Sequence, residues 1–313
     1  MSLAQPYTRP FYDRTALALE NAAQLGILCV TAFGNTQNIP YIAGAISETP
    51  NVLTVGATNT PTDASSPLYM EGYSARGPGE ANILKPDLSA PGTLPLAVVG
   101  TGDQYALTSG TSFAAPFVAG AAALLRQHCP MCDPLAIKAL FMNTADRNIL
   151  YSGDEGEQRM APVTRMGSGM LRIDKALNAT LWAFSLEERQ PSFSFGIVDA
   201  SSDTIFAKTI RIQTIVSRAR TLRFSYELRN ASKANVMNAT FFPPEVDIPE
   251  SCDYEVDVQV QIYIIAENAP VNTMTTSGFR GLDPEPLDRH EFDGHFLIQS
   301  DVDQEISLPF HMI

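Results

Sequence analysis

The sequence predicts an α/β part with a parallel sheet, followed by an all-β sandwich. Two segments, "ILCVTA" (residues 27–32) and "NVLTVGAT" (residues 51–58), are almost continuously apolar, as is typical of parallel strands covered by helices on both faces. After about residue 183, short segments alternate apolar and polar residues instead, for example "TLRFSYEL" and "YEVDVQVQI". We therefore assign residues 1–185 to the α/β part and residues 186–313 to the sandwich.

Helical segments flank the two apolar strands. Residues 14–24, "RTALALENAAQ", consist largely of strong helix formers, and Gly26 follows them. Residues 133–145 form a second predicted helix, with Asp133 as N-cap and Pro134 in the first helical position. Helices that alternate with apolar strands predict the parallel sheet, whereas no helix is expected in the alternating segments of the second part.

Composition and charge exclude several classes of partner. Of 313 residues, 45% are hydrophobic and 18% are charged, so a large core is expected. The formal net charge of −13 disfavours a nucleic-acid partner, because phosphate binding needs clustered Lys and Arg. No apolar run reaches the roughly 18–20 residues of a membrane span, and no signal peptide is visible.

Four cysteines are too few for a disulfide scaffold. Cys129 and Cys132 form one Cys-x-x-Cys sequence beside His128, but a structural zinc site needs four ligands and no second pair exists. We expect a structural or locally bridged pair there, and no metal site.

The stretch "SGTSFAAPFVAG" (residues 109–120) carries the strongest signal for chemistry. Pro116 requires the helix to begin nearby, at about Ser112, and the apolar run that follows predicts burial on every side. A serine at a helix N-terminus exposes its hydroxyl, while its backbone N–H can stabilise a developing oxyanion. Taken alone, the same serine is equally typical of an ordinary N-cap.

The stretch "TAFGNTQN" (residues 31–38) ends the first predicted strand. Ligands bind outside the carboxyl ends of strands in open α/β sheets, and the amide of Asn35 could donate to an oxyanion there. A Gly-Asn turn that simply ends the strand is the alternative.

Together with "SARGP" and "KPDLSAPG", these stretches resemble the subtilisin-like serine proteases, the subtilases of peptidase family S8. Every fixed position of the family's G-T-S-x-A-x-P-x-V-A-G signature is met by residues 110–120. The resemblance implies that Ser112 is the nucleophile and that Asn35 supplies the oxyanion hole. It also implies that Ala32, Gly34 and Thr111 contact substrate, with Phe33 pointing away from the substrate pocket.

The resemblance covers roughly residues 14–180, and the remainder resembles the fibronectin type III-like domain of larger secreted subtilases. It implies a polypeptide substrate and an extracellular location. Calcium is common in the family, but the acidic stretch "SGDEGEQ" (residues 152–158) reads as a solvated turn. No cofactor is therefore expected.

The catalytic aspartate and histidine of the family have no counterpart here. The four histidines, His128, His290, His295 and His311, all follow Ser112, and no D-T-G or H-G-T-H sequence is present. The substrate-binding S-L-G strand is expected to be absent too. The sequence therefore predicts a C-terminal portion of a subtilase that is inactive without an N-terminal segment carrying Asp and His. The alternatives are a non-catalytic descendant that binds through its sandwich and an unrelated α/β enzyme.

Overall fold

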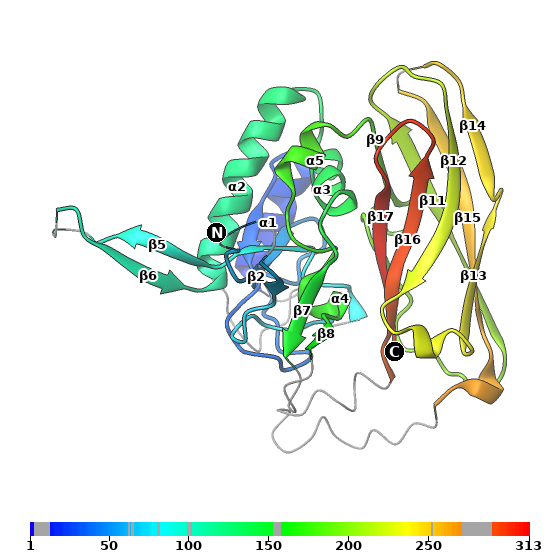
Figure 1. The fold of residues 1–313 in the computed structure, drawn as a ribbon, viewed down its shortest axis with the longest axis horizontal. Coiled ribbons are helices and arrows are strands. Elements are labelled where there is room, and N and C mark those ends of the chain that lie inside the picture. Colours follow the sequence, from blue (N-terminus) through cyan, green and yellow to red (C-terminus); the bar gives the residue numbers. More distant parts are fainter. Residues whose placement is uncertain are drawn as a thin grey trace.

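The computed structural model describes two packed parts, one α/β and one all-β (Figure 1). The residues it describes are all those of the chain except 3–12, 62, 64–65, 80–81, 99, 101, 153–157, 252 and 271–289. The predicted turn "SGDEGEQ" therefore lies mostly outside the described residues.

The elements of the first part are α1 (Arg14–Gln24), β1 (Val30–Ala32), β2 (Leu53–Thr58), β3 (Leu68–Tyr69), β4 (Leu88–Pro91), β5 (Thr93–Ala97), β6 (Tyr105–Ser109), α2 (Thr111–His128), α3 (Pro134–Asn143), β7 (Ile149–Ser152), β8 (Gln158–Met160), α4 (Val163–Met166) and α5 (Ile173–Leu177). The second part contains β9 (Leu181–Ser185), β10 (Phe193–Ser194), β11 (Thr204–Thr214), β12 (Arg220–Leu228), β13 (Met237–Phe242), β14 (Glu245–Ile248), β15 (Glu255–Ile264), β16 (Phe292–Ser300) and β17 (Ile306–Met312).

A parallel sheet in the order β1-β2-β4 forms the centre of the first part, as predicted. Helix α2 packs across all three strands and shares a core with Leu53 and Val55 of β2. The short helix α4 lies against the opposite face, where a Cβ on Gly56 would lie 3.3 Å from the carbonyl oxygen of Arg165. The close approach of α4 explains why glycine interrupts the apolar sequence of β2.

Helices α1 and α3 begin as the local sequence predicts. Asp13 accepts hydrogen bonds from two backbone N–H groups of α1, and Asp133 accepts one from Ala136 at 2.7 Å. Pro134 occupies the first turn of α3, where its missing N–H costs nothing. Both helices therefore owe their starting points to side-chain caps that can be read from the sequence.

Helix α2 starts at Thr111, within one residue of the predicted position, but the prediction that it is buried on every side is wrong. Phe117 and Leu124 are 48% and 54% exposed, whereas Val118 and Leu125 are fully buried. The sheet and α3 cover only one face of the helix, and a uniformly apolar sequence does not show how many faces have partners.

The antiparallel hairpin β5–β6 leads into α2 and projects away from the rest of the structure (Figure 1). Its residues Tyr105 and Leu107 are 70% and 74% exposed. The described residues of the first part therefore leave an apolar hairpin and an apolar helix face uncovered.

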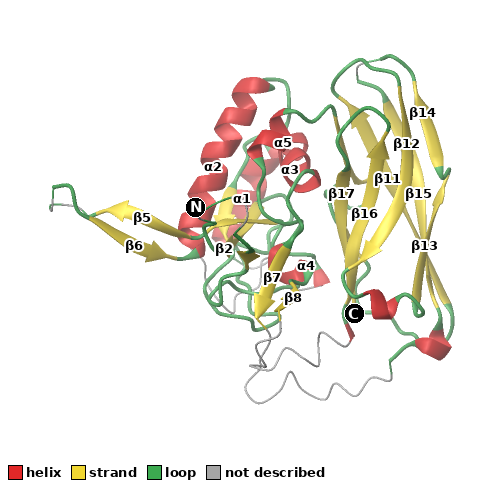
Figure 2. Ribbon diagram, in the orientation of Figure 1, coloured by secondary structure: helices red, strands yellow, loops and turns green. Residues whose placement is uncertain are grey.

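The second part consists of two sheets packed face to face (Figure 2). One has the strand order β10-β17-β16-β12-β14 and the other β13-β15-β11-β9. Alternate residues of the long strands enter one core, for example Val258 and Val260 from β15 opposite Phe296 and Ile298 from β16. The predicted alternation thus corresponds to strands with one buried face, and short 3₁₀ turns lie between some of them.

Strand β9 lies before the predicted boundary at residue 186, yet it pairs with β11 in the second part. Its alternating side chains serve both cores: Leu181 and Ala183 face the sandwich, whereas Trp182 and Phe184 pack against the core of the first part. Asn143 of α3 also joins the first part to the second, since it accepts from the Ala183 N–H at 2.8 Å and donates to the Ser307 carbonyl at 3.1 Å. The two parts therefore share a strand and a buried polar contact.

Lys85 and Asp87, from the segment "KPD", form a buried charge cluster with Lys138 of α3. The two carboxylate oxygens of Asp87 lie 2.7 Å from Lys85 Nζ and 2.8 Å from Lys138 Nζ. Burial lowers the pKa of Lys85 to about 7, although the charge of Asp87 opposes this shift. Asp87 also accepts the Thr54 N–H at 2.7 Å, so one carboxylate joins two lysines to β2.

We expect Asp87→Asn to destabilise the chain by about 3–5 kcal/mol, because it leaves two buried ammonium groups without a counter-charge. The free energy of unfolding, from urea denaturation, measures this. The matched control is Asp174→Asn, since the Arg172–Asp174 pair is exposed and its loss should cost less than about 1 kcal/mol. Equal effects of the two substitutions would contradict the structural importance of the cluster.

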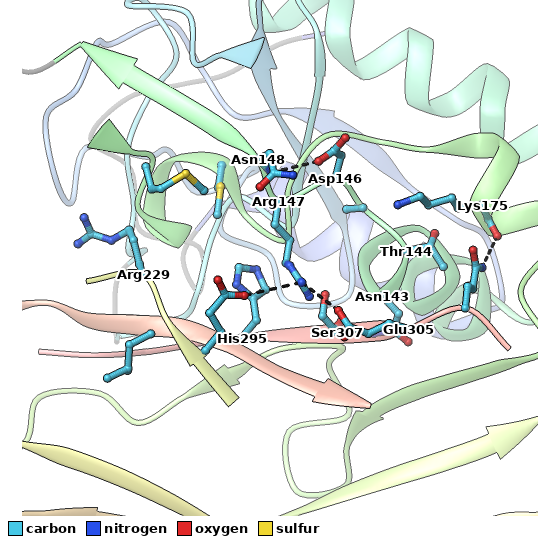
Figure 3. Close-up of a pocket in the computed structure, with 16 residues that line it drawn as sticks. Asn143, Thr144, Asp146, Arg147, Asn148, Lys175, Arg229, His295, Glu305 and Ser307 are labelled. Carbon is cyan, nitrogen blue, oxygen red and sulfur yellow. Dashed lines mark hydrogen bonds and ion pairs between the residues drawn. The ribbon is translucent and has the colours of Figure 1, made fainter. Parts of the chain in front are cut away.

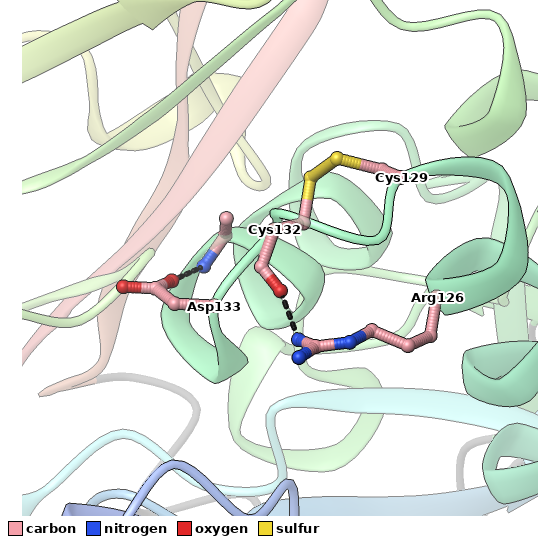
Figure 4. Close-up of a disulfide and its surroundings, with 5 residues drawn as sticks. Arg126, Cys129, Cys132 and Asp133 are labelled. Atoms are coloured by element: carbon pink, nitrogen blue, oxygen red, sulfur yellow. Dashed lines mark hydrogen bonds between the residues drawn. A yellow bond between two sulfur atoms is a disulfide. The ribbon is translucent and has the colours of Figure 1, made fainter.

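Cys129 and Cys132 form a disulfide at the end of α2, with their Cα atoms 5.4 Å apart (Figure 4). The Cys132 carbonyl accepts a hydrogen bond from Arg126. Of the two alternatives for this pair, the locally bridged one is therefore observed. The disulfide fixes the turn between α2 and α3.

Candidate active site

A pocket of about 350 Å³ lies where the carboxyl end of β1 meets the N-terminus of α2. All five predicted site residues line it: Ala32, Gly34, Asn35, Thr111 and Ser112. They come from two segments that are more than seventy residues apart. The parallel sheet brings them together because β1 ends on the side of the sheet where α2 begins.

Asn35 is fixed by the start of α2. Its Oδ1 accepts hydrogen bonds from the Thr111 backbone N–H at 3.0 Å and from the Thr111 hydroxyl at 2.9 Å. The first of these bonds satisfies an N–H that the helix leaves without an internal partner. Because Oδ1 is occupied in this way, the Nδ2 group is the part of the amide that remains to donate to a ligand.

Two glycines allow this close arrangement. Gly34 has a φ of 123°, which other residues rarely adopt, and its N–H donates to the Thr111 hydroxyl at 3.1 Å. A Cβ on Gly110 would lie 3.3 Å from Asn35 Nδ2 and would crowd the amide. The Thr111 hydroxyl thus accepts from Gly34 and donates to Asn35, which ties the end of β1 to the helix.

Ser112 is the second residue of α2 and is partly exposed. Its hydroxyl donates to the Ser2 carbonyl at 3.1 Å, so it bonds to a backbone oxygen and not to a basic side chain. All four histidines are among the described residues, and none lines this pocket. His128 ends the same helix, about 24 Å away at 1.5 Å per residue.

The backbone of Met1–Ser2 lies beside the outer edge of β1. The Ala32 N–H donates to the Met1 carbonyl at 3.1 Å, and the Met1 amino group donates to Val30. The expectation that nothing corresponds to the S-L-G strand is therefore wrong. The signal is present in the opening "MSLA", whose Ser2 and Leu3 match the first two of those positions, but it is too short to stand out.

Phe33 and Ala32 point into different environments, as strand alternation requires. Ala32 belongs to the core beneath α2, whereas Phe33 packs in a small cluster with Ala43 and Ala75. Both are 1% exposed, although both contribute to the wall of the pocket.

Tyr73 is a titratable side chain close to the turn before α2, since its hydroxyl interacts with the backbone of Gly110. Burial raises the pKa of Tyr73, so the phenol stays protonated at neutral pH. It cannot accept a proton from Ser112 under these conditions. The described residues that line the pocket therefore supply a hydroxyl and amide donors, and no titratable side chain that could act as a general base is among them.

A second pocket, of about 320 Å³, lies between the two parts and is lined by polar residues (Figure 3). Arg147 pairs there with Glu305 at 2.9 Å. Burial, followed by the charge of Arg147, lowers the pKa of His295 to about 3, so its imidazole is neutral. Sequence analysis did not predict this pocket, and it contains none of the predicted site residues.

The described part of the chain shows neither a metal-binding cluster nor a membrane-spanning helix. No group of three or more His, Cys, Asp or Glu side chains there is arranged to hold a metal ion. None of the described helices is long and apolar enough to cross a membrane.

Known proteins share sequence similarity with the part of the chain that contains this pocket. The Subtilase family profile matches residues 1–169, just over half of the chain. The chain is 29% identical over 216 residues to Subtilisin-like protease SBT2.3 of Arabidopsis thaliana, covering 55% of the chain and 26% of that protein. It is 33% identical over 165 residues to Subtilisin-like protease SBT3 of Solanum lycopersicum, covering 46% of the chain and 21% of that protein.

A bacterial relative, Minor extracellular protease Vpr of Bacillus subtilis (strain 168), is 32% identical over 166 residues. This match covers 49% of the chain and 19% of the relative. The chain thus spans about a quarter or less of the length of these three proteins. Because the family profile covers more than half of the chain and includes the pocket, the chain belongs to the subtilase family.

Proposed function

We propose that the chain supplies the nucleophile and the oxyanion donors of a subtilisin-like serine endopeptidase. The observation that carries this proposal is the meeting of Asn35 and Ser112 in one pocket, with Asn35 held by two hydrogen bonds to Thr111. Ala32, Gly34 and Thr111 line the same pocket and would contact the substrate. The substrate class is a polypeptide.

The chemistry follows from this arrangement. Ser112 Oγ attacks the scissile carbonyl carbon, and the carbonyl oxygen gains negative charge. The Ser112 backbone N–H and Asn35 Nδ2 would donate to that oxygen from about 3 Å, supported by the dipole of α2. The Ser112 proton must go to a base, and it must then reach the leaving amine as the peptide bond breaks.

No histidine of this chain lies at the pocket, so we propose that the base comes from a second polypeptide segment. By resemblance to the family, that segment carries the aspartate and histidine. The uncovered faces of α2 and β5–β6 are surfaces on which such a segment could pack. We propose further that the β-sandwich is fibronectin type III-like. The Cys129–Cys132 disulfide supports an extracellular location, since disulfides persist in oxidising compartments.

The test is complementation. The purified chain is mixed with a subtilase segment that carries the D-T-G and H-G-T-H sequences, and casein hydrolysis is followed. We expect no hydrolysis by either component alone and hydrolysis by the mixture. A segment in which that histidine is replaced by alanine is the control, and it should not restore activity. Failure of a stable complex to hydrolyse casein would favour the non-catalytic reading, in which the sandwich acts as a binding module.

A further inference from the structure

A run of buried polar contacts connects the β-sandwich to the loop that carries Asn35. Glu291 immediately precedes β16, and its carboxylate Oε2 lies 2.7 Å from Arg76 Nη2. Both side chains are completely buried. They are 215 residues apart in the sequence and come from different parts of the fold.

Arg76 continues this run toward the loop. Its Nη1 donates to Asn38 Oδ1 at 3.4 Å, and its Nε donates to the Thr164 hydroxyl at 3.3 Å. The Thr164 hydroxyl in turn donates to Glu291 Oε1 at 2.6 Å. Glu291 therefore holds the guanidinium directly and through Thr164, which fixes the orientation of the planar group.

The backbone around Arg76 supports the same loop. The Ala75 N–H donates to the Gly34 carbonyl at 3.0 Å, and the Gln37 N–H donates to the Tyr73 carbonyl at 3.0 Å. Residues 73–76 thus contact residues 34–38 on both sides of Asn35. A displacement of Arg76 would reach Asn35 through these contacts.

Several groups surround Glu291. Besides Arg76, Arg229 Nη2 lies 3.6 Å from its Oε2, and His311 Nε2 lies 3.4 Å from its Oε1. Burial opposes ionisation of Glu291, but these neighbours, Arg76 foremost, hold its pKa well below the usual range. The carboxylate is therefore charged at neutral pH, and its loss would leave Arg76 buried without this counter-charge.

We propose that Glu291 is a positioning residue, through which the β-sandwich orders the oxyanion loop, residues 33–38, by way of Arg76. The inference rests on the proposed function, because ordering this loop matters for catalysis only if Asn35 binds an oxyanion. The β-sandwich then contributes to the catalytic geometry although none of its described residues lines the Ser112 pocket.

Hydrogen exchange of the full chain, followed by mass spectrometry, tests the coupling without any catalysis. We expect Glu291→Gln to speed exchange in residues 33–38 by about tenfold or more, while exchange in the β11–β15 ladder stays within about twofold. The control is Asp257→Asn, which removes a carboxylate from the exposed Arg211–Asp257 pair. It should leave the oxyanion loop unchanged. Unchanged loop exchange in folded Glu291→Gln would overturn the proposal.

If Glu291→Gln does not fold, hydrogen exchange of the double variant Arg76→Gln/Glu291→Gln tests the proposal instead. It removes both charges, so no unpaired charge of this pair stays buried, but glutamine is shorter than arginine and should not hold Asn38. Rapid exchange confined to the oxyanion loop would support the proposal. Exchange that rises equally throughout the chain would show a general loss of stability and overturn it.

Activity in the complemented enzyme provides a separate readout. Glu291→Gln should lower kcat about tenfold with KM changed less than about twofold, because a mispositioned donor weakens binding of the transition state more than that of the substrate. Coupled exchange in a complex that never hydrolyses casein would refute the proposed function but retain the link from Glu291 to the loop. A normal kcat in folded Glu291→Gln would overturn the positioning role.

Discussion

Ser112→Ala should lower kcat of the complemented enzyme by about 10⁶, the loss seen when subtilisin itself loses its serine. The reason is that alanine has no oxygen to attack the scissile carbonyl, so no acyl-enzyme can form. Casein or peptide hydrolysis at saturating substrate measures the change. Residual hydrolysis would reflect the oxyanion donors and substrate binding alone.

The matched control for this prediction is Ser109→Ala. Ser109 is an exposed serine of β6, only three residues away, whose hydroxyl contacts Thr93 rather than the pocket. It should keep kcat within about twofold of the unsubstituted enzyme. Similar losses in both variants would show that the effect comes from disturbance of the chain around residue 110, and the assignment of Ser112 would fail.

Asn35→Asp should lower kcat by about 10²–10³ with little change in KM, the range known for loss of the oxyanion asparagine in subtilisin. Aspartate keeps an oxygen that can accept both Thr111 hydrogen bonds, so the start of α2 should remain capped. It lacks the Nδ2 donor, and its negative charge opposes the oxyanion. The substitution thus separates the catalytic contribution of Asn35 from its structural one.

Asn59→Asp is the control for that change, because Asn59 follows β2 much as Asn35 follows β1. Its Oδ1 accepts the Tyr69 N–H at 2.8 Å, and it does not line the Ser112 pocket. We expect kcat to remain within about twofold. An Asn35→Asp enzyme with full activity would mean that Asn35 serves only to cap the helix.

The sequence predicted best what neighbouring residues determine. Asp133 caps its helix through a bond to a residue only three positions away, and the alternation of Val256, Val258 and Val260 requires only that one face of β15 be buried. The parallel sheet also follows from local runs of apolar residues. Strand β1 is shorter than predicted, since residues 27–29 are apolar but precede its pairing with β2.

Features that depend on distant partners could not be predicted. The apolar face of α2 looks the same in sequence whether or not another element covers it. The pairing of Arg76 with Glu291 spans 215 residues, and neither residue has a local signal for it. The sequence could single out residues that the structure brings together in one pocket, because the motifs that contain them are short and specific. The direction of the Asn35 amide required the position of Thr111.

Labelling of Ser112 by a fluorophosphonate, which reacts with activated serines, tests the central claim most directly. The claim is that the chain holds a nucleophile and its oxyanion donors but no base. We predict negligible labelling of the isolated chain at neutral pH and strong labelling at Ser112 once the Asp- and His-bearing segment is added. Strong labelling of Ser112 in the isolated chain would contradict the account, because some group of this chain would then already act as the base.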